Sequence, residues 1–213
     1  MKEILLHPCY FGPITQFVAM IKTDKIRFEN EDNFQKQTYR NRMYIYSANG
    51  RLALSIPIRH TGNKTQHQKF KEVQIENDFP WQQQHWRSLE TCYRTSPFFE
   101  FYEDEFQGLY SRKFKYLLDF NYACLEVLHT VLEWDLDYLK TTKFEKEAPG
   151  DLVDGRHLVD AKAKKDFGLS PYTQVFQQKE GFLENLSILD LLFNEGPGTE
   201  AYLESQPMDL ILP

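Results

Sequence analysis

The sequence predicts an α/β fold, with a mixed α+β arrangement as the alternative, and three observations lead to this prediction. The chain opens with a short apolar stretch, a loop interrupted by Pro and Gly, and an amphipathic helix. An Asn-Gly pair follows between two alternating apolar runs, which is typical of a β-hairpin. From Trp81 onward, apolar residues recur every three or four positions, as in helices packed on a core. We therefore expect an N-terminal strand–loop–helix unit and hairpin, a helical middle section and a C-terminal helix.

The opening segment predicts a strand, a helix and a second strand. Residues 3–6 are apolar enough for a short buried strand, and Gly12 and Pro13 force the loop that follows. Pro13 suits the first turn of a helix, and residues 14–21 place their apolar side chains on one helical face. Residues 25–29 then alternate between polar and apolar, as a second strand would.

A hairpin is predicted next. The runs 43–46 and 51–56 flank Asn49-Gly50, and both of these residues tolerate the positive φ that a type I′ turn requires. Residues 59–69 carry little apolar content and are expected to form an exposed loop. Residues 70–76 alternate again and predict a further strand.

Two helical stretches follow, over residues 81–95 and 98–138, with Ser96-Pro97 as the break between them. Residues 138–144 resemble a late strand. Residues 145–170 are charged, contain Gly and lack clear periodicity, so we expect an exposed excursion with freedom to move.

The C-terminal segment predicts one more helix, over residues 187–193, which Gly196-Pro197 would stop. Ser187 suits the N-cap, and Asp190 at the third helical position suggests an acidic form of the capping box. A Ser–Asp pair without a nearby base is not a catalytic triad, so we interpret this segment as structural.

Length, charge and cysteine use narrow the class of protein. The 213 residues suit a single domain, and the net charge of −6 argues against a nucleic-acid binder. The three cysteines have no paired spacing, which favours free thiols in a reducing compartment. No signal peptide opens the chain, and no apolar run approaches the ~18 residues of a membrane span. We expect a cytoplasmic protein without membrane insertion.

The loop after the first strand is the first candidate site. It places His7 and Cys9 at the carboxyl end of the strand, where open α/β sheets bind ligands, beside helix amides that favour an anion. His7 is the acid–base candidate, and Cys9 is a candidate nucleophile if its pKa is depressed. The alternative is structural: His7 makes a hydrogen bond and Cys9 fills the core.

Two basic segments are further candidates. Residues 35–42 carry two Arg, a Lys, an Asn and a Tyr, which suit phosphate or carboxylate. The alternative is a solvated edge whose charges pair with Glu29, Glu31 and Asp32. The loop from Arg59 to Lys69 is the weaker candidate for holding a diphosphate. Its histidines, His60 and His67, have no carboxylate at ligand spacing, so we predict no metal site and name no cofactor.

Several segments, taken in order, resemble the WbqC-like family of bacterial polysaccharide clusters over most of the chain. No single motif is diagnostic, but the ordered set is fairly specific. The matching segments are His7-Pro8-Cys9-Tyr10-Phe11-Gly12-Pro13 with Asp24 after the helix, Lys36 and Asn41-Arg42, Leu54-Ser55-Ile56-Pro57, Tyr93-Arg94-Thr95-Ser96-Pro97-Phe98-Phe99, Tyr172-Thr173-Gln174, and Leu186-Ser187-Ile188-Leu189-Asp190-Leu191-Leu192.

The sequence departs from the family pattern at three places. Many members carry Gln where His7 stands. Cys9 occupies a variable position, which argues against a cysteine nucleophile. The chain is also short between residues 145 and 170, where longer members carry a Gly-rich stretch.

The resemblance implies a role in O-antigen or lipopolysaccharide synthesis, as a transferase that moves an acyl or aminoacyl group, such as glycyl, onto a nucleotide-linked amino sugar. Because of the resemblance, we expect the loop to bind a ligand through its overall shape more than through the reactivity of His7 and Cys9. The expected catalytic residues are Asp24, His7 and Lys36. The expected substrate-binding residues are Pro8, Tyr10, Phe11, Asn41, Arg42, Tyr172 and Gln174.

Two alternatives stay open. One is a nucleotidyl-transfer enzyme, which the strand–loop–helix opening suggests but which lacks a second histidine at residues 14–17. The other is a non-enzymatic protein that binds a glycan intermediate or a partner enzyme. The sequence leaves the donor, the acceptor and the oligomeric state undetermined.

Overall fold

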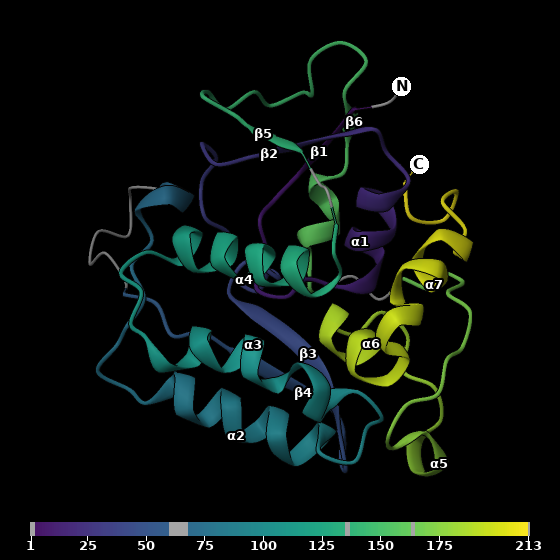
Figure 1. Ribbon diagram of the computed structural model, residues 1–213. Coiled ribbons are helices and arrows are strands. Elements are labelled where there is room, and N and C mark those ends of the chain that lie inside the picture. Colours follow the sequence, from purple (N-terminus) through teal and green to yellow (C-terminus); the bar gives the residue numbers. More distant parts are fainter. Residues whose placement is uncertain (1–2, 60–67, 135–136, 163–164, 213) are drawn as a thin grey trace.

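The computed structural model describes residues 3–59, 68–134, 137–162 and 165–212 and shows a mixed α/β fold. A four-stranded sheet lies at one end of the molecule, with a long connection looping above it (Figure 1). Helices and a separate two-stranded hairpin fill the remainder below and beside the sheet. The predicted fold class is confirmed.

The four-stranded sheet is parallel throughout. Its order is β5-β2-β1-β6, and the strands are β1 (Glu3–Leu6), β2 (Lys25–Phe28), β5 (Tyr138–Lys140) and β6 (Val153–Asp154). Helix α1 (Ile14–Ile21) connects β1 to β2, as parallel neighbours require a crossover. The predicted opening of strand, loop, helix and strand is confirmed, and Pro13 occupies the N-cap position of α1.

Strands β3 (Arg42–Ser47) and β4 (Gly50–Ser55) form the predicted antiparallel hairpin. The predicted type I′ turn is wrong. Ser47 pairs with Gly50, so Ala48 and Asn49 form the turn, and of these four residues only Gly50 has a positive φ, of 87°. A Gly with positive φ directly after a two-residue turn is enough to reverse the chain direction. Asn49 therefore keeps an ordinary negative φ.

The helical middle section is divided further than the periodicity indicated. Helix α2 (Trp81–Tyr93) ends before the Ser-Pro break as predicted, but the stretch 98–138 forms α3 (Phe99–Ser111) and α4 (Leu117–Val131). The linker between them is extended because its backbone bonds elsewhere: Lys115 accepts from the Ile75 amide, and Leu117 donates to Val73.

The strand predicted over residues 70–76 is also wrong. Phe70–Glu72 forms the 3-10 helix η1, and the following residues make single bridges instead of a ladder. The alternating pattern arises because Phe70, Val73 and Ile75 are all buried, each against a different segment. Three apolar side chains buried at uneven spacing do not require a continuous partner strand.

The C-terminal region contains α5 (Gln177–Glu180), α6 (Ile188–Glu195), η3 (Gly196–Gly198) and α7 (Thr199–Ser205). Ser187 caps α6 as predicted, since its hydroxyl accepts from the Leu189 amide. The acidic capping box is wrong, because the Asp190 carboxylate accepts from Tyr93, Tyr172 and Gln174 instead of reaching back to the cap.

Residues 145–170 are not simply the exposed excursion that we expected. They supply β6 and the 3-10 helix η2 (Arg156–Val159), which complete one edge of the parallel sheet. Leu158, Val159, Phe167 and Leu169 are buried. The absence of periodicity reflects how short these elements are, because a two-residue strand cannot show a repeat.

The core is unusually aromatic. Phe11, Phe106, Phe193 and Phe99 stack edge-on in sequence across the Pro loop, α3 and α6. Helices α2, α3 and α4 lie side by side beneath the sheet (Figure 1). Each large ring buries much apolar area. These ring contacts therefore stabilise the packing of helices that lie far apart in the sequence.

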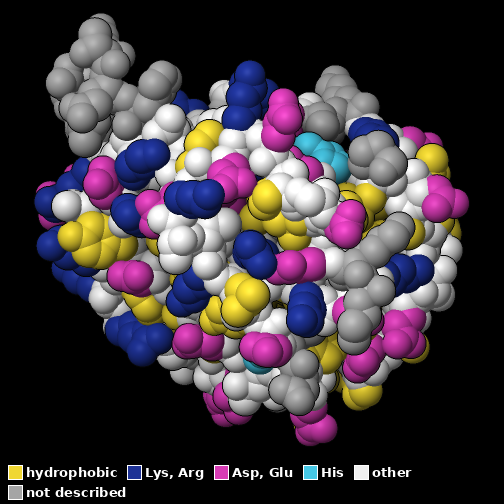
Figure 2. Space-filling view, turned by 90° about the horizontal axis from the view of Figure 1, so that it is seen from above, with side chains coloured by type: hydrophobic (Ala, Val, Ile, Leu, Met, Phe, Trp, Pro, Cys, Tyr) yellow, Lys and Arg dark blue, Asp and Glu magenta, His cyan; other side chains and the backbone are white. Residues whose placement is uncertain are grey.

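On the surface seen from above the sheet, acidic and basic side chains are interspersed and apolar ones form small separate patches (Figure 2). Within the described part of the chain, no helix combines the length and the apolar character needed to span a bilayer.

Gly196→Ala is expected to destabilise the protein by at least about 2 kcal/mol. Gly196 has a φ of 53°, and a Cβ added there would lie 2.5 Å from the ring of Phe98. Gly108 is the matched control. It lies within α3, an added Cβ would touch nothing within 4 Å, and Gly108→Ala should stabilise by about 0.5–1 kcal/mol. Urea unfolding of the two variants measures both, and equal effects would contradict the prediction.

Candidate functional site

A cavity of about 320 Å³ opens where the carboxyl ends of β1, β2 and β6 meet, and we call it the crevice. β1 has β2 on one side and β6 on the other, so the chain leaves β1 in one direction and later returns on its opposite side. Open parallel sheets bind ligands at such reversals of strand order. The crevice is lined by His7, Asp32, Asn33, Gln35, Arg40, Phe144, Lys146, Arg156, His157 and Val159.

Three buried polar side chains form a close triangle in the crevice. His7 Nε2 lies 2.9 Å from Asp32 Oδ2 and 2.8 Å from an Arg40 terminal nitrogen. The same Arg40 nitrogen donates to Asp32 Oδ2 at 2.7 Å. Arg40 is 1% exposed and its guanidinium also stacks over the Phe70 ring. A fully buried cation and anion in direct contact neutralise each other and hold the imidazole between them.

Burial sets the charge state of His7. Together with the nearby Arg40 cation, burial lowers the pKa of His7 to about 4, against the opposing effect of Asp32. The pKa of Asp32 lies below its usual value, because the contacts with His7 and Arg40 outweigh the effect of its own burial. At neutral pH the triangle therefore contains a neutral imidazole, a carboxylate and a guanidinium.

Each member of the triangle keeps a polar atom without a hydrogen-bond partner among the described residues. These atoms are His7 Nδ1, Asp32 Oδ1 and Arg40 Nε. Buried polar atoms are nearly always hydrogen-bonded, so three unpaired ones on residues that line one cavity call for a partner, such as an ordered water or a ligand group reached by a small shift of these side chains.

The loop after β1 is held so that His7 faces the crevice. The His7 carbonyl accepts from the Gln16 side chain at 2.8 Å, and Asn121 in α4 donates to the carbonyls of Pro8 and Arg40. A Cβ added at Gly12 would lie 2.7 Å from Gln16 Oε1, so the Gln16 side chain that holds this loop would have to shift. The side-chain amide of Asn121 therefore connects the loop to the segment that contains Arg40.

The helix N-terminus beside this loop does not offer the free amides that we expected for an anion. The Ile14 amide donates to the Leu186 carbonyl, and the Thr15 amide donates to the Asn185 side chain. The loop itself is tied to the start of α6, because the Ser187 hydroxyl donates to the Phe11 carbonyl. The amides at the start of α1 therefore bind the segment that precedes α6 and are not available to an anion.

A second cavity, of about 540 Å³, lies on the other side of residues 35–42, and we call it the cationic pocket. Its charged lining residues are Lys36, Arg42 and Lys162, and no Asp or Glu of the described part of the chain lines it. Asn41 Oδ1 and Arg42 Nε are buried there without a partner among the described residues. The remaining lining residues are Phe34, Gln37, Ile56, Pro57 and Ile58. An apolar wall beside these three cations suits a ligand with an anionic group and a flat or apolar part.

Comparison with known proteins gives the same assignment as the sequence motifs. Residues 7–166 match the WbqC-like protein family, which is well over half of the chain. The chain belongs to the WbqC-like protein family. It is also 25% identical over 229 residues to "Uncharacterized protein Rv1507c" of Mycobacterium tuberculosis, with 95% of this chain and 98% of that protein covered. No solved structure matches the chain.

The expected catalytic residues of this WbqC-like protein do not meet at one point. His7 lines the crevice and Lys36 lines the cationic pocket. Asp24 is exposed and precedes β2, at the amino end of the sheet and away from His7. Burial raises the pKa of Cys9 to about 12, so its thiol stays protonated and is a poor nucleophile.

The expected substrate-binding residues fall into three groups. Asn41 and Arg42 share the cationic pocket with Lys36. Pro8, Tyr10 and Phe11 are buried in the core and line neither the crevice nor the cationic pocket.

Tyr172 and Gln174 form the third group and bind the fully buried Asp190, at 2.5 and 2.9 Å. The motif containing Tyr172 and the motif containing Asp190 are therefore joined in the core.

Sequence reasoning considered Arg40 as one of the two arginines of the basic segment 35–42, and Asp32 only as a charge that this segment could pair with. The ion pair between Asp32 and Arg40 is formed. Arg156 and His157 follow β6 and were not recognised. The rule that residues after parallel strands gather at one edge would have drawn attention to Asp32.

The remaining predictions concern a metal site and the basic loop from Arg59 to Lys69. Among the described residues, no group of three His, Cys, Asp or Glu side chains is arranged to hold a metal ion. His60 and His67 lie outside the described residues. Arg59 pairs with Glu76, and Lys69 donates to the Glu31 carbonyl.

Proposed function

We propose that this protein is a transferase that binds a nucleotide-linked sugar and moves an acyl or aminoacyl group onto its amine. The observation that carries the proposal is the cationic pocket, which combines three cations, no carboxylate and an apolar wall. Lys36, Arg42 and Lys162 would bind the diphosphate, and Phe34 would pack against the base. A role in surface-polysaccharide or O-antigen synthesis is part of the same proposal and draws its support from the family.

His7 is the residue that we assign to proton transfer. When Nε2–H donates to Asp32, Nδ1 carries the free lone pair and faces no other described partner. The substrate amine attacks the acyl carbon, the new C–N bond forms, and the bond to the leaving group breaks while Nδ1 accepts the amine proton. Because the Arg40 cation contributes to lowering the pKa of His7, an anionic substrate beside Arg40 would raise it toward the useful range.

Arg42→Ala is expected to weaken nucleotide-sugar binding by about 10- to 100-fold, the loss that corresponds to one charge-assisted hydrogen bond. Arg51→Ala is the matched control, since Arg51 is exposed on the same hairpin and lines neither cavity. The measurement is thermal unfolding against a panel of nucleotide sugars, where a ligand at a hundred times its Kd stabilises by about 2.7 kcal/mol. The proposal fails if no nucleotide sugar stabilises the protein, or if both variants behave alike.

A nucleotidyl-transfer enzyme is the second candidate, and one observation favours it. His157, brought in after β6, lines the same crevice as His7, together with Arg40, Arg156 and Lys146. Two imidazoles among cations suit attack on a phosphate. Turnover of nucleoside triphosphates that His157→Gln abolishes would select this function. A nucleotide sugar that binds without any turnover would instead select the binding-protein alternative.

A further inference from the structure

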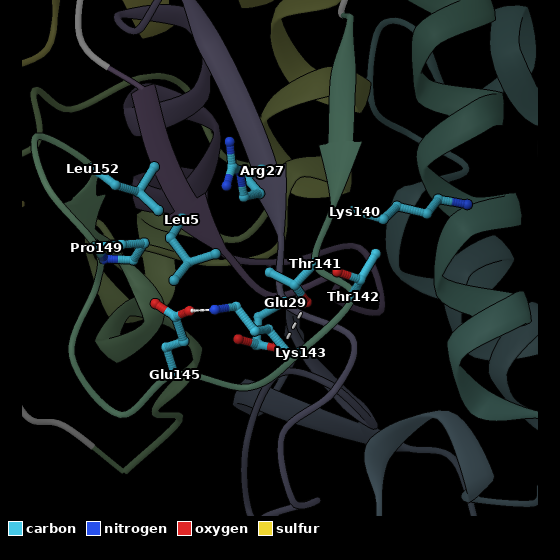
Figure 3. A pocket seen from close by; sticks show the side chains of 10 residues that line it. All are labelled: Leu5, Arg27, Glu29, Lys140, Thr141, Thr142, Lys143, Glu145, Pro149 and Leu152. Carbon is cyan, nitrogen blue, oxygen red and sulfur yellow. Dashed lines mark hydrogen bonds and ion pairs between the residues drawn. The ribbon is translucent and has the colours of Figure 1, made fainter.

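A smaller cavity, of about 110 Å³, is lined by Glu29, which lies 3.8 Å from the crevice residue Arg156, and we call it the small cavity (Figure 3). It is enclosed by the ends of β1 and β2 and by the chain that follows β5. Its lining residues are Leu5, Arg27, Glu29, Lys140, Thr141, Thr142, Lys143, Glu145, Pro149 and Leu152. Pockets for drug-sized ligands measure roughly 300–1,000 Å³, so this one suits a single small functional group.

Glu29 is the buried charge of the small cavity, with only 1% of its surface exposed. Its Oε1 accepts from the Thr141 hydroxyl and from the Glu31 amide, both at 2.8 Å. Its Oε2 lies 3.8 Å from Arg156, which is too long for a hydrogen bond, and the described residues offer no closer donor. A buried carboxylate normally fills its acceptor sites, so Oε2 is available to a ligand donor.

The cations around the small cavity are engaged elsewhere. Arg27 pairs with Glu3 at 2.8 Å, and Lys143 pairs with Glu145. Lys140 points away from Glu29, with its ammonium 4.1 Å from the centre of the Tyr122 ring (Figure 3). Arg156 makes its short contacts with Asp154. Among the described residues, Arg156 is thus the nearest cation to Glu29, at an ion-pair distance of 3.8 Å and without a hydrogen bond to Oε2.

The small cavity adjoins the crevice through the register of the sheet. Leu6 pairs with Phe28, and the Glu29 amide donates to the Leu6 carbonyl at 2.8 Å. His7 and Glu29 are the residues that follow this pair, so their backbones lie about one strand spacing apart, roughly 4.8 Å. A group bound at Glu29 is therefore next to the crevice.

We propose that the small cavity is a subsite for a primary ammonium group, with Glu29 as its counter-ion and Thr141 holding the carboxylate in place. The apolar side chains of Leu5, Pro149 and Leu152 would enclose the carbon that carries the ammonium. The ligand class follows from charge, size and the free acceptor oxygen. That this group is the acceptor amine of the transfer rests on the proposed function, but its binding does not.

The test uses 2-aminoethanol as the charged probe and ethylene glycol as its neutral counterpart of the same size. Backbone amide NMR shifts of Thr141, Thr142 and Leu152 are followed at constant ionic strength. We expect saturable shifts with 2-aminoethanol, none with ethylene glycol, and at least a tenfold weaker affinity in Glu29→Gln. Glu145→Gln is the matched control, because Glu145 lines the same cavity but already pairs with Lys143, and it should retain the affinity within twofold.

Equal responses to both probes, or an unchanged affinity in Glu29→Gln, would overturn the proposal. If Glu29→Gln does not fold, Thr141→Val decides in its place: we expect weaker binding of 2-aminoethanol, and unchanged binding would overturn the proposal. Nucleotide-sugar binding is measured on the same samples. Its loss in Arg42→Ala concerns the proposed function alone, whereas loss of 2-aminoethanol binding in Glu29→Gln concerns the subsite alone.

Discussion

Arg40→Met is expected to lower the free energy of unfolding by about 3–5 kcal/mol, the cost of removing one partner of a buried ion pair. Met keeps most of the apolar volume of Arg but leaves the Asp32 carboxylate buried without its guanidinium. Asp32 and Arg40 are 5% and 1% exposed, and their contact is 2.7 Å long. Denaturant unfolding at neutral pH measures the loss.

Two controls separate the ion pair from packing. In Arg40→Met with Asp32→Asn, neither charge is left alone, so much of the lost stability should return. Arg59→Met removes an exposed partner of Glu76, with a side chain 51% exposed, and should cost no more than about 1 kcal/mol. If Arg40→Met costs no more than Arg59→Met, the pair does not stabilise the crevice.

Acid is expected to destabilise the protein between pH 6.5 and pH 4, by about 3 kcal/mol for each of the buried histidines His7 and His85. Burial lowers the pKa of both histidines to about 4, and the charge of Arg40 contributes to the lowering of the pKa of His7. The unfolded chain takes up each proton near pH 6.5, whereas the folded protein does so only near pH 4. The stability is therefore fully present above pH 6.5 and is lost as the pH falls through this window.

His7→Gln and His85→Gln measure each share separately, by comparing the free energy of unfolding at pH 7 and at pH 4.5. Each variant should lose less stability on acidification than the parent does. Asp190 acts in the opposite sense, because its own burial raises its pKa, but it is the same in parent and variants. A variant whose stability falls as steeply as the parent's would show that its histidine does not resist protonation in the fold.

The sequence predicted those parts of the fold whose signals are local. The opening strand, the loop and α1 were recognisable because Gly12, Pro13 and the apolar face are continuous in the chain. The break between α3 and α4 was not, because the 112–116 linker has no Pro or Gly and its aromatic residues continue the apolar spacing of the flanking helices. Its extended form depends on Val73 and Ile75, which lie far away in the sequence.

Only those residues of the candidate site whose signals are local could be predicted. His7 could be placed at a strand end from local pattern, and Lys36, Asn41 and Arg42 were recognised together because they lie within one basic segment. Arg156 depends on a two-residue strand that no periodicity reveals. Asp24 illustrates the converse, because it precedes β2 at the amino end of the sheet, whereas the crevice lies at the carboxyl ends of the strands.

The pairing of β1 with β6 has a consequence for synthesis and folding. Ile4 pairs with Val153, and Gly155 must pass close to Leu6, where an added Cβ would lie 2.7 Å from a methyl carbon. While the ribosome is still making the middle of the chain, the hairpin and α2 can form, but one edge of β1 has no partner. Such non-local contacts form late, because the long intervening chain must first be made and closed into a loop. The crevice needs Arg156 and His157 after β6 and is thus among the last parts of the molecule to form.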